Sequence, residues 1–401
     1  MKLPMYIGQI NQALHTQNAY KLSSYIEVFG KHTEKMLLDS PESNRDVERN
    51  CHDRLEQPWS DIIFHHIMAG RAISKGDFIE AYEAQNTALA AFLRDFQKTT
   101  NWSLEALFTI NKDLCKLAVE ADKQLEQRGE APVSLEDCAR MVNKSFTSCI
   151  TDRSPIQSSK KWGTYNIACI LFRTYFKLKS HNLCKNIIRA IQVAELPELS
   201  QFPMAHQVTM RYYTGVLSSF DADFTKAEAD LQFAFDRTPP KFHKHRRLIL
   251  NYLIPARLLR GSLPSASLLR EFPELDSLYG PLIHAIKTGN VQLFDEGLSQ
   301  AAGRFMVMGT YLTVEMSRGL VMRTLFKKVY KTTGGTSRVS ISAFQTALAF
   351  VGVTADLDEV ECMIANMIYK NYIRGYLSQE KRILVLSKGN PFPSISSIQP
   401  V

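Results

Sequence analysis

The chain has 401 residues and a mass of 45.5 kDa, which is long enough for two or three domains with a sizeable buried core. Hydrophobic residues make up 45% of the sequence and charged residues 22%, which excludes a disordered or collagen-like chain. No apolar run approaches the roughly 18 residues of a membrane-spanning helix, and the N-terminal residues are too polar for a secretory signal. The sequence therefore predicts an intracellular protein.

Residues from about 60 to 330 have the periodicity of amphipathic helices. In the segment 78–93, a single stripe of seven positions is apolar except for Gln85. We expect such helices in pairs, joined by turns in which a bend residue precedes a capping Asp or Asn and then an apolar anchor. Four turns match this description: residues 74–78, 179–183, 220–224 and 287–291. In the second of these, the pattern assigns the cap to Asn182 and the anchor to Leu183.

The spacing between these turns is irregular, which favours a degenerate tetratricopeptide-like solenoid over a strict 34-residue repeat. Each hairpin leaves an apolar face that only the next hairpin can cover. Stacked hairpins form a long curved surface, which suits protein binding better than chemistry. A scaffold is therefore the leading class of function.

After Tyr330 the periodicity changes. A Gly-rich turn leads to a short β-branched segment at 338–341, and helices are expected at 342–350 and from residue 357 onward. Segments 373–377 and 382–386 then predict a β-hairpin. Helix, strand, helix, helix and hairpin is the element order of a winged helix.

The predicted fold is mainly α: a TPR-like helical solenoid followed by a C-terminal winged helix. Five parts are expected along the chain: an N-terminal helical segment at 1–55, TPR-like hairpins at 56–205, a further helical part at 206–320, the winged helix at 321–393 and a tail at 394–401.

Positive charge is concentrated at the end of the chain. From Arg318 onward, the chain has eleven basic and five acidic residues, so this last fifth carries +6 of the total net charge of +8. Such a segment is a candidate for contact with phosphate backbones or with an acidic partner, and charge alone does not choose between them.

A second basic run follows the helix-breaking pair Pro239 and Pro240. One interpretation is a solvated loop that leads into a helix; the other is a binding site for an acidic peptide or nucleic acid. On the second interpretation, the partner-binding residues are Lys241, Lys244, Arg246 and Arg247.

No residue pattern predicts a catalytic, metal or cofactor site. The seven cysteines are scattered without a Cys-x-x-Cys pair, which argues for reduced, mostly buried thiols and against a disulfide framework or zinc site. The phosphate-binding, dinucleotide-binding and serine-hydrolase glycine motifs are absent from the sequence. The alternative to a scaffold is an enzyme, namely a hydrolase that uses His243 and His245, although the spacing of these histidines does not fit a zinc-protease helix.

Several aromatic residues have two possible roles. Trp59, Trp102 and Trp162 are expected to be core residues, with peptide anchoring as the alternative. Tyr372 and Tyr376 could either stack on nucleic-acid bases or pack the hairpin onto the last helix.

A helical solenoid that continues into a winged helix resembles the PCI-domain proteins, the shared scaffold of the proteasome lid, the COP9 signalosome and a translation initiation factor. Over residues 55 to 393, the chain more narrowly resembles the family of PCI domain-containing protein 2, the Thp-type mRNA export factors and the COP9-subunit-twelve-like proteins. The most specific motif of this resemblance is Lys-Gly-Asn-Pro-Phe-Pro at 388–393. The other segments that carry the resemblance are 77–82, 159–163, 183–191, 325–330 and 365–369.

This resemblance implies a non-enzymatic scaffold subunit of the transcription-export complex 2, located in the nucleus at nuclear pores, with the cytoplasm as a second location. The implied partners are a Sac-type, GANP-like scaffold protein and a small acidic protein of the Dss/Sem type. It also implies a basic winged-helix surface for RNA or DNA, without cofactors or membrane insertion. The residues that fit this surface are Lys327, Lys328, Lys331, Lys370, Arg374, Lys381, Arg382 and Lys388.

Acidic residues limit how this surface would read nucleic acid. Asp358, Glu359 and Glu361 lie in the predicted recognition helix, which favours backbone contacts that are salt-sensitive and weakly sequence-specific. The alternative is a COP9-subunit-twelve-like scaffold in transcription or splicing, with protein partners only.

Overall fold

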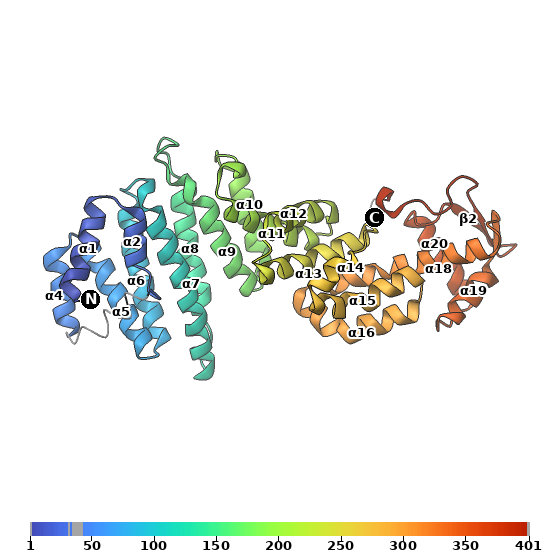
Figure 1. The fold of residues 1–401 in the computed structure, drawn as a ribbon, viewed down its shortest axis with the longest axis horizontal. Helices are drawn as coiled ribbons and strands as arrows, with labels where there is room; N and C mark the ends of the chain where they lie inside the picture. The colour runs from blue at the N-terminus through green and yellow to red at the C-terminus, as the bar shows by residue number, and fades with distance from the viewer. Residues whose placement is uncertain (1, 31–32, 34–42, 399–401) are drawn as a thin grey trace. The chain divides into compact units, whose positions relative to one another are not determined.

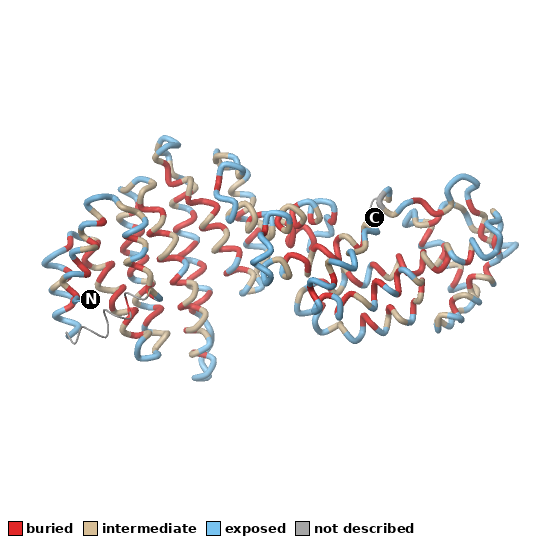
Figure 2. The backbone as a smooth tube through the Cα atoms, in the orientation of Figure 1, coloured by how far each residue is buried: buried red, intermediate tan, exposed pale blue. Residues whose placement is uncertain are grey.

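The computed structural model describes residues 2–30, 33 and 43–398 and consists of two compact units, Met1–Met210 and Arg211–Val401. Residues 1, 31–32, 34–42 and 399–401, which belong to the predicted N-terminal segment and the predicted tail, lie outside the described residues. Figure 1 shows that both units are built mainly of helices, and Figure 2 shows buried residues along the helix faces that pack together. Within the described ranges, no helix is long and apolar enough to cross a lipid bilayer.

The first unit is a stack of antiparallel helices (Figure 1). From α5 to α9, each helix packs against the next, and α6 and α7 also contact the helix after that, as expected for a solenoid. The helices are α1 (Leu3–His15), α2 (Ala19–Tyr25), α4 (Asn44–Arg54), α5 (Trp59–Ser74), α6 (Phe78–Phe96), α7 (Leu104–Gln127), α8 (Ser134–Ile150), α9 (Thr164–Lys177), α10 (His181–Val193) and α11 (Met204–Phe220), the last of which runs into the second unit. Short 3₁₀ turns lie at η1 (Asn101–Ser103), η2 (Lys160–Gly163) and η3 (Leu199–Gln201).

The helix-joining turns share one backbone geometry. In three of the four predicted turns, a left-handed residue ends one helix and the following Asp or Asn caps the next. The carboxyl or amide oxygens of Asp77, Asp223 and Asn290 accept hydrogen bonds of 3.0–3.1 Å from backbone N–H groups of the helices they precede. The predicted caps are therefore confirmed at these turns.

The turn at 179–183 differs from its prediction by two residues. Lys179 is the left-handed residue, with φ of 55°, so Ser180 takes the N-cap position and α10 begins at His181. Asn182 consequently lies inside the helix and Leu183 is exposed, so neither cap nor anchor is where the pattern assigned it. The next residue, Cys184, is fully buried instead.

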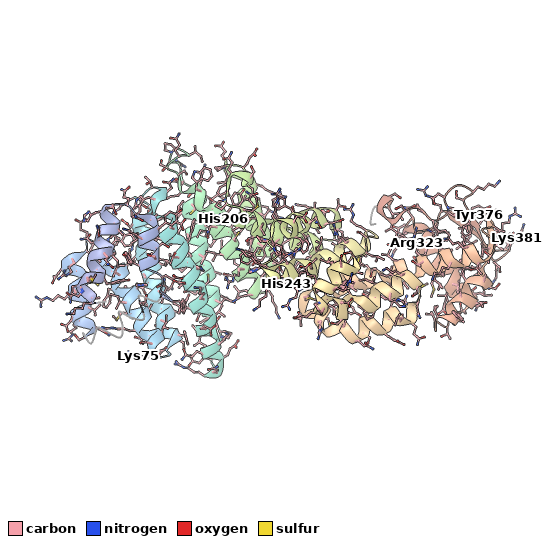
Figure 3. The ribbon with its side chains drawn as sticks, in the orientation of Figure 1. Lys75, His206, His243, Arg323, Tyr376 and Lys381 are labelled. Atoms are coloured by element: carbon pink, nitrogen blue, oxygen red, sulfur yellow. The ribbon has the colours of Figure 1, made fainter. Side chains whose placement is uncertain are left out.

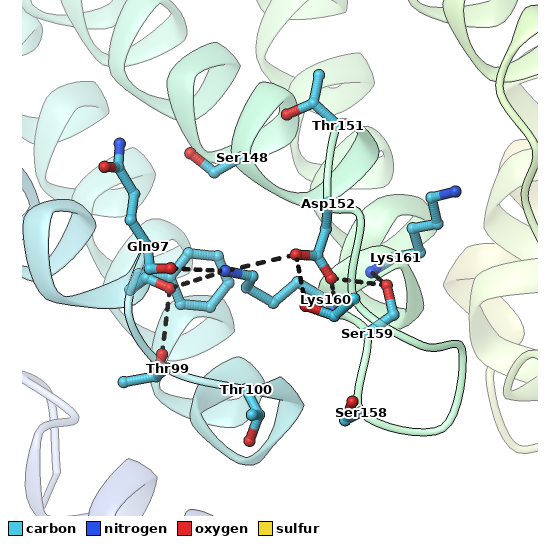
Figure 4. A network of polar contacts seen from close by, with 12 residues as sticks. Gln97, Thr99, Thr100, Ser148, Thr151, Asp152, Ser158, Ser159, Lys160 and Lys161 are labelled. Atoms are coloured by element: carbon cyan, nitrogen blue, oxygen red, sulfur yellow. Dashed lines mark hydrogen bonds and ion pairs between the residues drawn. The ribbon is translucent and has the colours of Figure 1, made fainter.

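A buried lysine closes the loop between α8 and α9 (Figure 4). The Lys160 ammonium group donates to the carbonyl oxygens of Phe96 and Gln97, at 3.1 and 3.2 Å, and lies 3.6 Å from the Asp152 carboxylate. Asp152 in turn accepts hydrogen bonds from the Ser159 hydroxyl and the Lys160 backbone N–H. A cation at the C-terminus of α6 also complements the helix dipole. The segment 159–163, which is one of those that resemble the PCI family, therefore has a structural role.

The tryptophans divide between core and half-buried positions. Trp59 is buried, packs edge-to-face on Phe92 and donates to Asp95, so its predicted core position is confirmed. Trp102 and Trp162 are half-buried, and the Trp162 ring lies 5.0 Å from the ring of Phe202.

The second unit continues with helices and ends in a small sheet (Figure 1). Its helices are α12 (Phe224–Arg237), α13 (His243–Leu259), α14 (Ala266–Glu271), α15 (Pro273–Thr288), α16 (Val291–Met308), α17 (Tyr311–Met316), α18 (Arg318–Thr332), α19 (Ile341–Phe350) and α20 (Leu357–Tyr369). The strands are β1 (Arg338–Ser340), β2 (Gly375–Ser378) and β3 (Ile383–Leu386), and a 3₁₀ turn η4 (Ile395–Ser397) follows.

The C-terminal elements form the predicted winged helix. The order α18, β1, α19, α20, β2 and β3 matches the sequence pattern, and the sheet is antiparallel in the order β1-β3-β2. Val339 and Leu384 are opposite each other on its buried face. A capping box formed by Asp356 and Glu359 begins α20, which explains part of the acidic character of this helix.

Candidate nucleic-acid interface

Three basic side chains form a stripe along α18. Arg323, Lys327 and Lys331 are spaced four residues apart and therefore share one face of the helix. Burial lowers the pKa of Lys327, and the neighbouring Arg323 and Lys331 cations lower it further. These positive charges are thus close enough to repel one another, and a bound anion would relieve that repulsion.

Lys328 points elsewhere. Its ammonium group donates a 2.6 Å hydrogen bond to the Thr288 carbonyl oxygen at the end of α15. The structure therefore separates Lys328 from the Lys327 and Lys331 stripe, although all three were predicted as one group.

The segment 387–393 lies against α18. The Arg323 guanidinium donates to the Pro393 carbonyl oxygen at 2.5 Å, and the Tyr330 and Phe392 rings are 5.7 Å apart. The backbone N–H of Arg374 donates to Pro391 at 2.8 Å. These contacts hold the specific Lys-Gly-Asn-Pro-Phe-Pro motif beside the cationic stripe, and they leave Lys388 and Arg374 exposed.

The exposed face of the sheet carries a cation and an aromatic ring. Arg338 and Tyr376 are both register partners of Val385, in β1 and β2 respectively, so the three side chains lie in one row on the same face. Tyr376 is 63% exposed, and Figure 3 labels it together with Lys381 of the following turn. Arg338 was not among the predicted binding residues. Because side chains alternate along β1, Arg338 lies on the exposed face and the next residue, Val339, on the buried face.

Tyr372 does not share this exposure. It is half-buried, its ring lies against Gly319, and burial raises its pKa. The structure thus separates the two tyrosines: Tyr372 packs, and Tyr376 is available to a ligand.

The turn between β2 and β3 presents the remaining wing residues. Lys381 is exposed, as is Lys370 just after α20. Arg382 adopts a left-handed conformation, and its guanidinium lies 3.2 Å from the Asp358 carboxylate of α20. This exposed ion pair is weak, but it partly neutralises the cation that the sequence assigned to the wing.

The second basic run lies largely within α13 and not in a loop, since that helix begins at His243. Lys241 and Lys244 are exposed, whereas Arg246 is paired with Glu271 at 2.8 Å and Arg247 with Glu274. Only the two lysines therefore present unpaired charge to a partner.

The histidines of this run do not converge. His243 and His245 are two residues apart in the first turn of α13, so they do not share a helix face. The His243 ring packs 4.4 Å from the Phe272 ring, and the His245 ring is 5.9 Å from that of Phe242. Among the described residues, no group of three or more His, Cys, Asp and Glu side chains is arranged to hold a metal ion.

An apolar patch lies at the junction of α16 and α17. Met306, Val307, Leu312 and Met316 are all exposed, and Val307 is 91% exposed. Val307 also lines a groove together with Leu275 and other residues of α15. Sequence reasoning missed this patch because an amphipathic stripe does not show which of its residues a neighbouring helix leaves uncovered. Clustered exposed apolar residues are typical of protein-binding surfaces.

Comparison with known proteins identifies the family. The PCI domain model matches residues 298–388, which include the winged helix. The chain is 36% identical to PCI domain-containing protein 2 of Xenopus laevis, with 98% of each chain covered. It is 35% identical to the CSN12 homolog of Schizosaccharomyces pombe, again over 98% of each chain. It is also 32% identical to enhanced ethylene response protein 5 of Arabidopsis thaliana, over 86% of this chain and 83% of that protein. This chain belongs to the PCI-domain family that contains PCI domain-containing protein 2 and the CSN12 homologues.

Proposed function

We propose that this protein is a non-enzymatic scaffold subunit of the transcription-export complex 2, which couples transcription to export of messenger RNA at the nuclear pore. In this role it binds a Sac/GANP-type scaffold protein and a small acidic Dss/Sem-type protein in the nucleus. Its winged helix contributes a basic surface for the RNA or DNA backbone.

The observation that carries the nucleic-acid part is the arrangement on the winged helix. The row of Arg338, Val385 and Tyr376 supplies a cation and an exposed ring, and the α18 stripe supplies further positive charge. Cations that follow a phosphate backbone, together with an aromatic ring for stacking, are the usual elements of single-strand binding. The acidic residues of α20 disfavour insertion of that helix into a groove, so backbone contacts are expected.

Two surfaces support the protein partners. The apolar patch of Met306, Val307, Leu312 and Met316 suits a large scaffold protein, because burying it would remove apolar surface from water. The exposed Lys241 and Lys244 suit an acidic partner.

The second candidate is a CSN12-like scaffold in transcription or splicing that binds proteins only. The Arg382–Asp358 ion pair favours it, because that pair lowers the positive potential at the wing. Under this function the basic stripe would meet an acidic protein surface and not a phosphate backbone.

The test reverses charge at Lys327, Lys331, Arg338 and Lys381 in the complex purified with its natural partners. If the proposal is correct, the affinity for single-stranded RNA falls and subunit assembly is retained. Each lost phosphate contact should also reduce the slope of log K against log salt concentration by about 0.7. The matched control reverses Lys75, Lys98, Lys144 and Lys226, which are exposed lysines remote in sequence from the winged helix.

Equal RNA affinity in the two variants would exclude the nucleic-acid function and leave the protein-only scaffold. Mass spectrometry of co-purifying proteins separates the two candidates, because the proposal requires a Sac-type scaffold among them.

A further inference from the structure

A pair of cysteines lies beside a basic cavity in the first unit. The sulfur atoms of Cys115 in α7 and Cys138 in α8 are 3.2 Å apart, and the Thr174 hydroxyl of α9 lies 3.6 Å from the Cys115 sulfur. Cys138 is fully buried, whereas Cys115 is only partly buried. The two thiols are therefore in contact, and one of them can be reached from outside.

The cavity gives access to Cys115. It measures about 30 Å³, roughly twice the minimum that one water needs, and Cys115 and Thr174 lie in its wall. Its remaining polar lining consists of four cationic side chains: Lys112, Lys116, Arg173 and Lys177. Lys116 is paired with Asp113 at 2.9 Å. Within the described part of the chain, the other three head groups have no ion-pair partner.

This environment favours the thiolate form of Cys115. The hydrogen bond from Cys138 lowers the pKa of Cys115, and the Thr174 hydroxyl and the Arg173 and Lys177 cations lower it further, against the effect of burial. The same hydrogen bond raises the pKa of Cys138, so Cys115 is the thiol of the pair that loses its proton more readily. By contrast, burial raises the pKa of both Cys149 and Cys184 to about 12.

We propose that Cys115 and Cys138 form a peroxide-reactive dithiol site, with Cys115 as the attacking sulfur and Cys138 as the resolving one. The Cys115 thiolate attacks one oxygen of hydrogen peroxide, the O–O bond breaks, and Cys115 becomes a sulfenic acid with release of hydroxide. The Cys138 thiol then attacks the Cys115 sulfur, an S–S bond forms, and the hydroxyl group leaves as water with the Cys138 proton. Two thiols and one peroxide thus give one disulfide and, once the hydroxide has taken up a proton, two waters.

The geometry suits each step. The cavity volume of about 30 Å³ admits the two-oxygen peroxide molecule and excludes bulky oxidants. The surrounding cations stabilise both the thiolate and the hydroxide that leaves. The sulfurs need to approach by only about 1.2 Å to reach the disulfide length of about 2.05 Å. A low-pKa, accessible cysteine next to a resolving cysteine is the usual arrangement of a redox-responsive pair.

The test exposes the reduced full-length protein to hydrogen peroxide and follows each cysteine by mass spectrometry of its peptide. We expect a cross-linked peptide pair containing Cys115 and Cys138, formed at least about tenfold faster than oxidation of the exposed Cys362. In a C138S variant, Cys115 should stop at the sulfenic acid and react with dimedone. An R173Q/K177Q double variant should form the disulfide at least about threefold more slowly, because the thiolate loses its counter-charges.

The K179Q variant is the matched control, because Lys179 is exposed and does not line the cavity. Circular dichroism shows whether each variant folds, and the R173Q/K177Q variant keeps both cysteines if C138S does not fold. A Cys362 that oxidises as fast as Cys115, or a peroxide-treated protein without the Cys115–Cys138 link, would overturn the proposal. So would equal rates in the R173Q/K177Q and control variants.

Discussion

Lys160 and Asp152 form a buried ion pair, yet the Lys160 ammonium group lies closer to the Phe96 carbonyl oxygen, at 3.1 Å, than to the carboxylate, at 3.6 Å. The lysine thus bonds the end of α6 and the α8–α9 loop at the same time (Figure 4). Its role is to hold two segments together, and only secondarily to neutralise a charge.

We predict that Lys160→Met destabilises the protein by about 3 kcal/mol, because it leaves Asp152 buried without its counter-charge and the α6 carbonyls without their donor. Urea unfolding measures the change. Lys98→Met removes the same charge from an exposed position nearby and should shift stability by less than about 0.5 kcal/mol. Equal losses in the two variants would contradict the structural role of Lys160.

Two glycine substitutions should act in opposite directions. A Cβ atom at Gly163 would lie 2.5 Å from a methyl carbon of Leu104, so Gly163→Ala should destabilise the protein by about 1–3 kcal/mol. Gly8 lies exposed inside α1, and among the described residues no atom outside the adjacent helix backbone lies within 4 Å of the position that a Cβ atom would take there, so Gly8→Ala should stabilise the protein by about 0.5–1 kcal/mol. Thermal unfolding of both variants against wild type checks the two signs.

His206 should make the first unit sensitive to mild acid. Its Nε2 accepts a 3.0 Å hydrogen bond from the Asn166 amide, and burial lowers its pKa below the usual 6.5 (Figure 3). The unfolded chain therefore binds a proton over a pH range in which the folded chain does not. Stability from this residue is complete above pH 6.5 and is lost as the pH falls from 6.5 toward the lower folded pKa.

His206→Gln should accordingly flatten the loss of stability below pH 6.5, as measured by urea midpoints across that range. The exposed His284→Gln variant should keep the wild-type profile. Parallel profiles for wild type and His206→Gln would show that this histidine does not titrate as expected.

Tyr376 provides a separate test of the proposed nucleic-acid surface. Tyr376→Ala should weaken binding of single-stranded RNA by about tenfold, because a stacked base loses its partner ring. Binding should weaken much less for duplex RNA, whose bases are already stacked. Fluorescence anisotropy with both ligands measures this, and Tyr20→Ala, which also removes an exposed tyrosine, serves as the control. An equal effect on both ligands would argue against stacking.

The winged helix could be predicted from the sequence because its signals are local. A Gly-rich turn, β-branched segments and the Asp356 cap each fix one boundary, and the structure confirms the order of the elements. The turn at 179–183 was misplaced because Asn182 was taken as the cap, whereas the residue that directly follows the left-handed Lys179 is Ser180. The proposed binding surface was only partly predictable, because the contacts of its side chains depend on tertiary packing.

Charge counting finds cations but not their neighbours. Lys328 bonds to a carbonyl of α15, and Arg382 pairs with Asp358, and both contacts depend on tertiary packing. Arg338 was missed because its role follows from strand register, which pairs it through Val385 with Tyr376. The proximity of Cys115 and Cys138 likewise needs the packing of α7 on α8.

The hydrogen bond from Arg323 to Pro393 has a practical consequence for anyone who trims the protein. A chain cut after Leu386 would retain every strand of the sheet. It would nevertheless leave the buried Arg323 guanidinium without its acceptor and remove the Phe392 ring that packs on Tyr330. Deletion endpoints chosen from secondary structure alone would therefore yield a weakened wing, and loss of RNA binding in such a fragment would reflect this lost packing as well as the removal of the exposed Lys388.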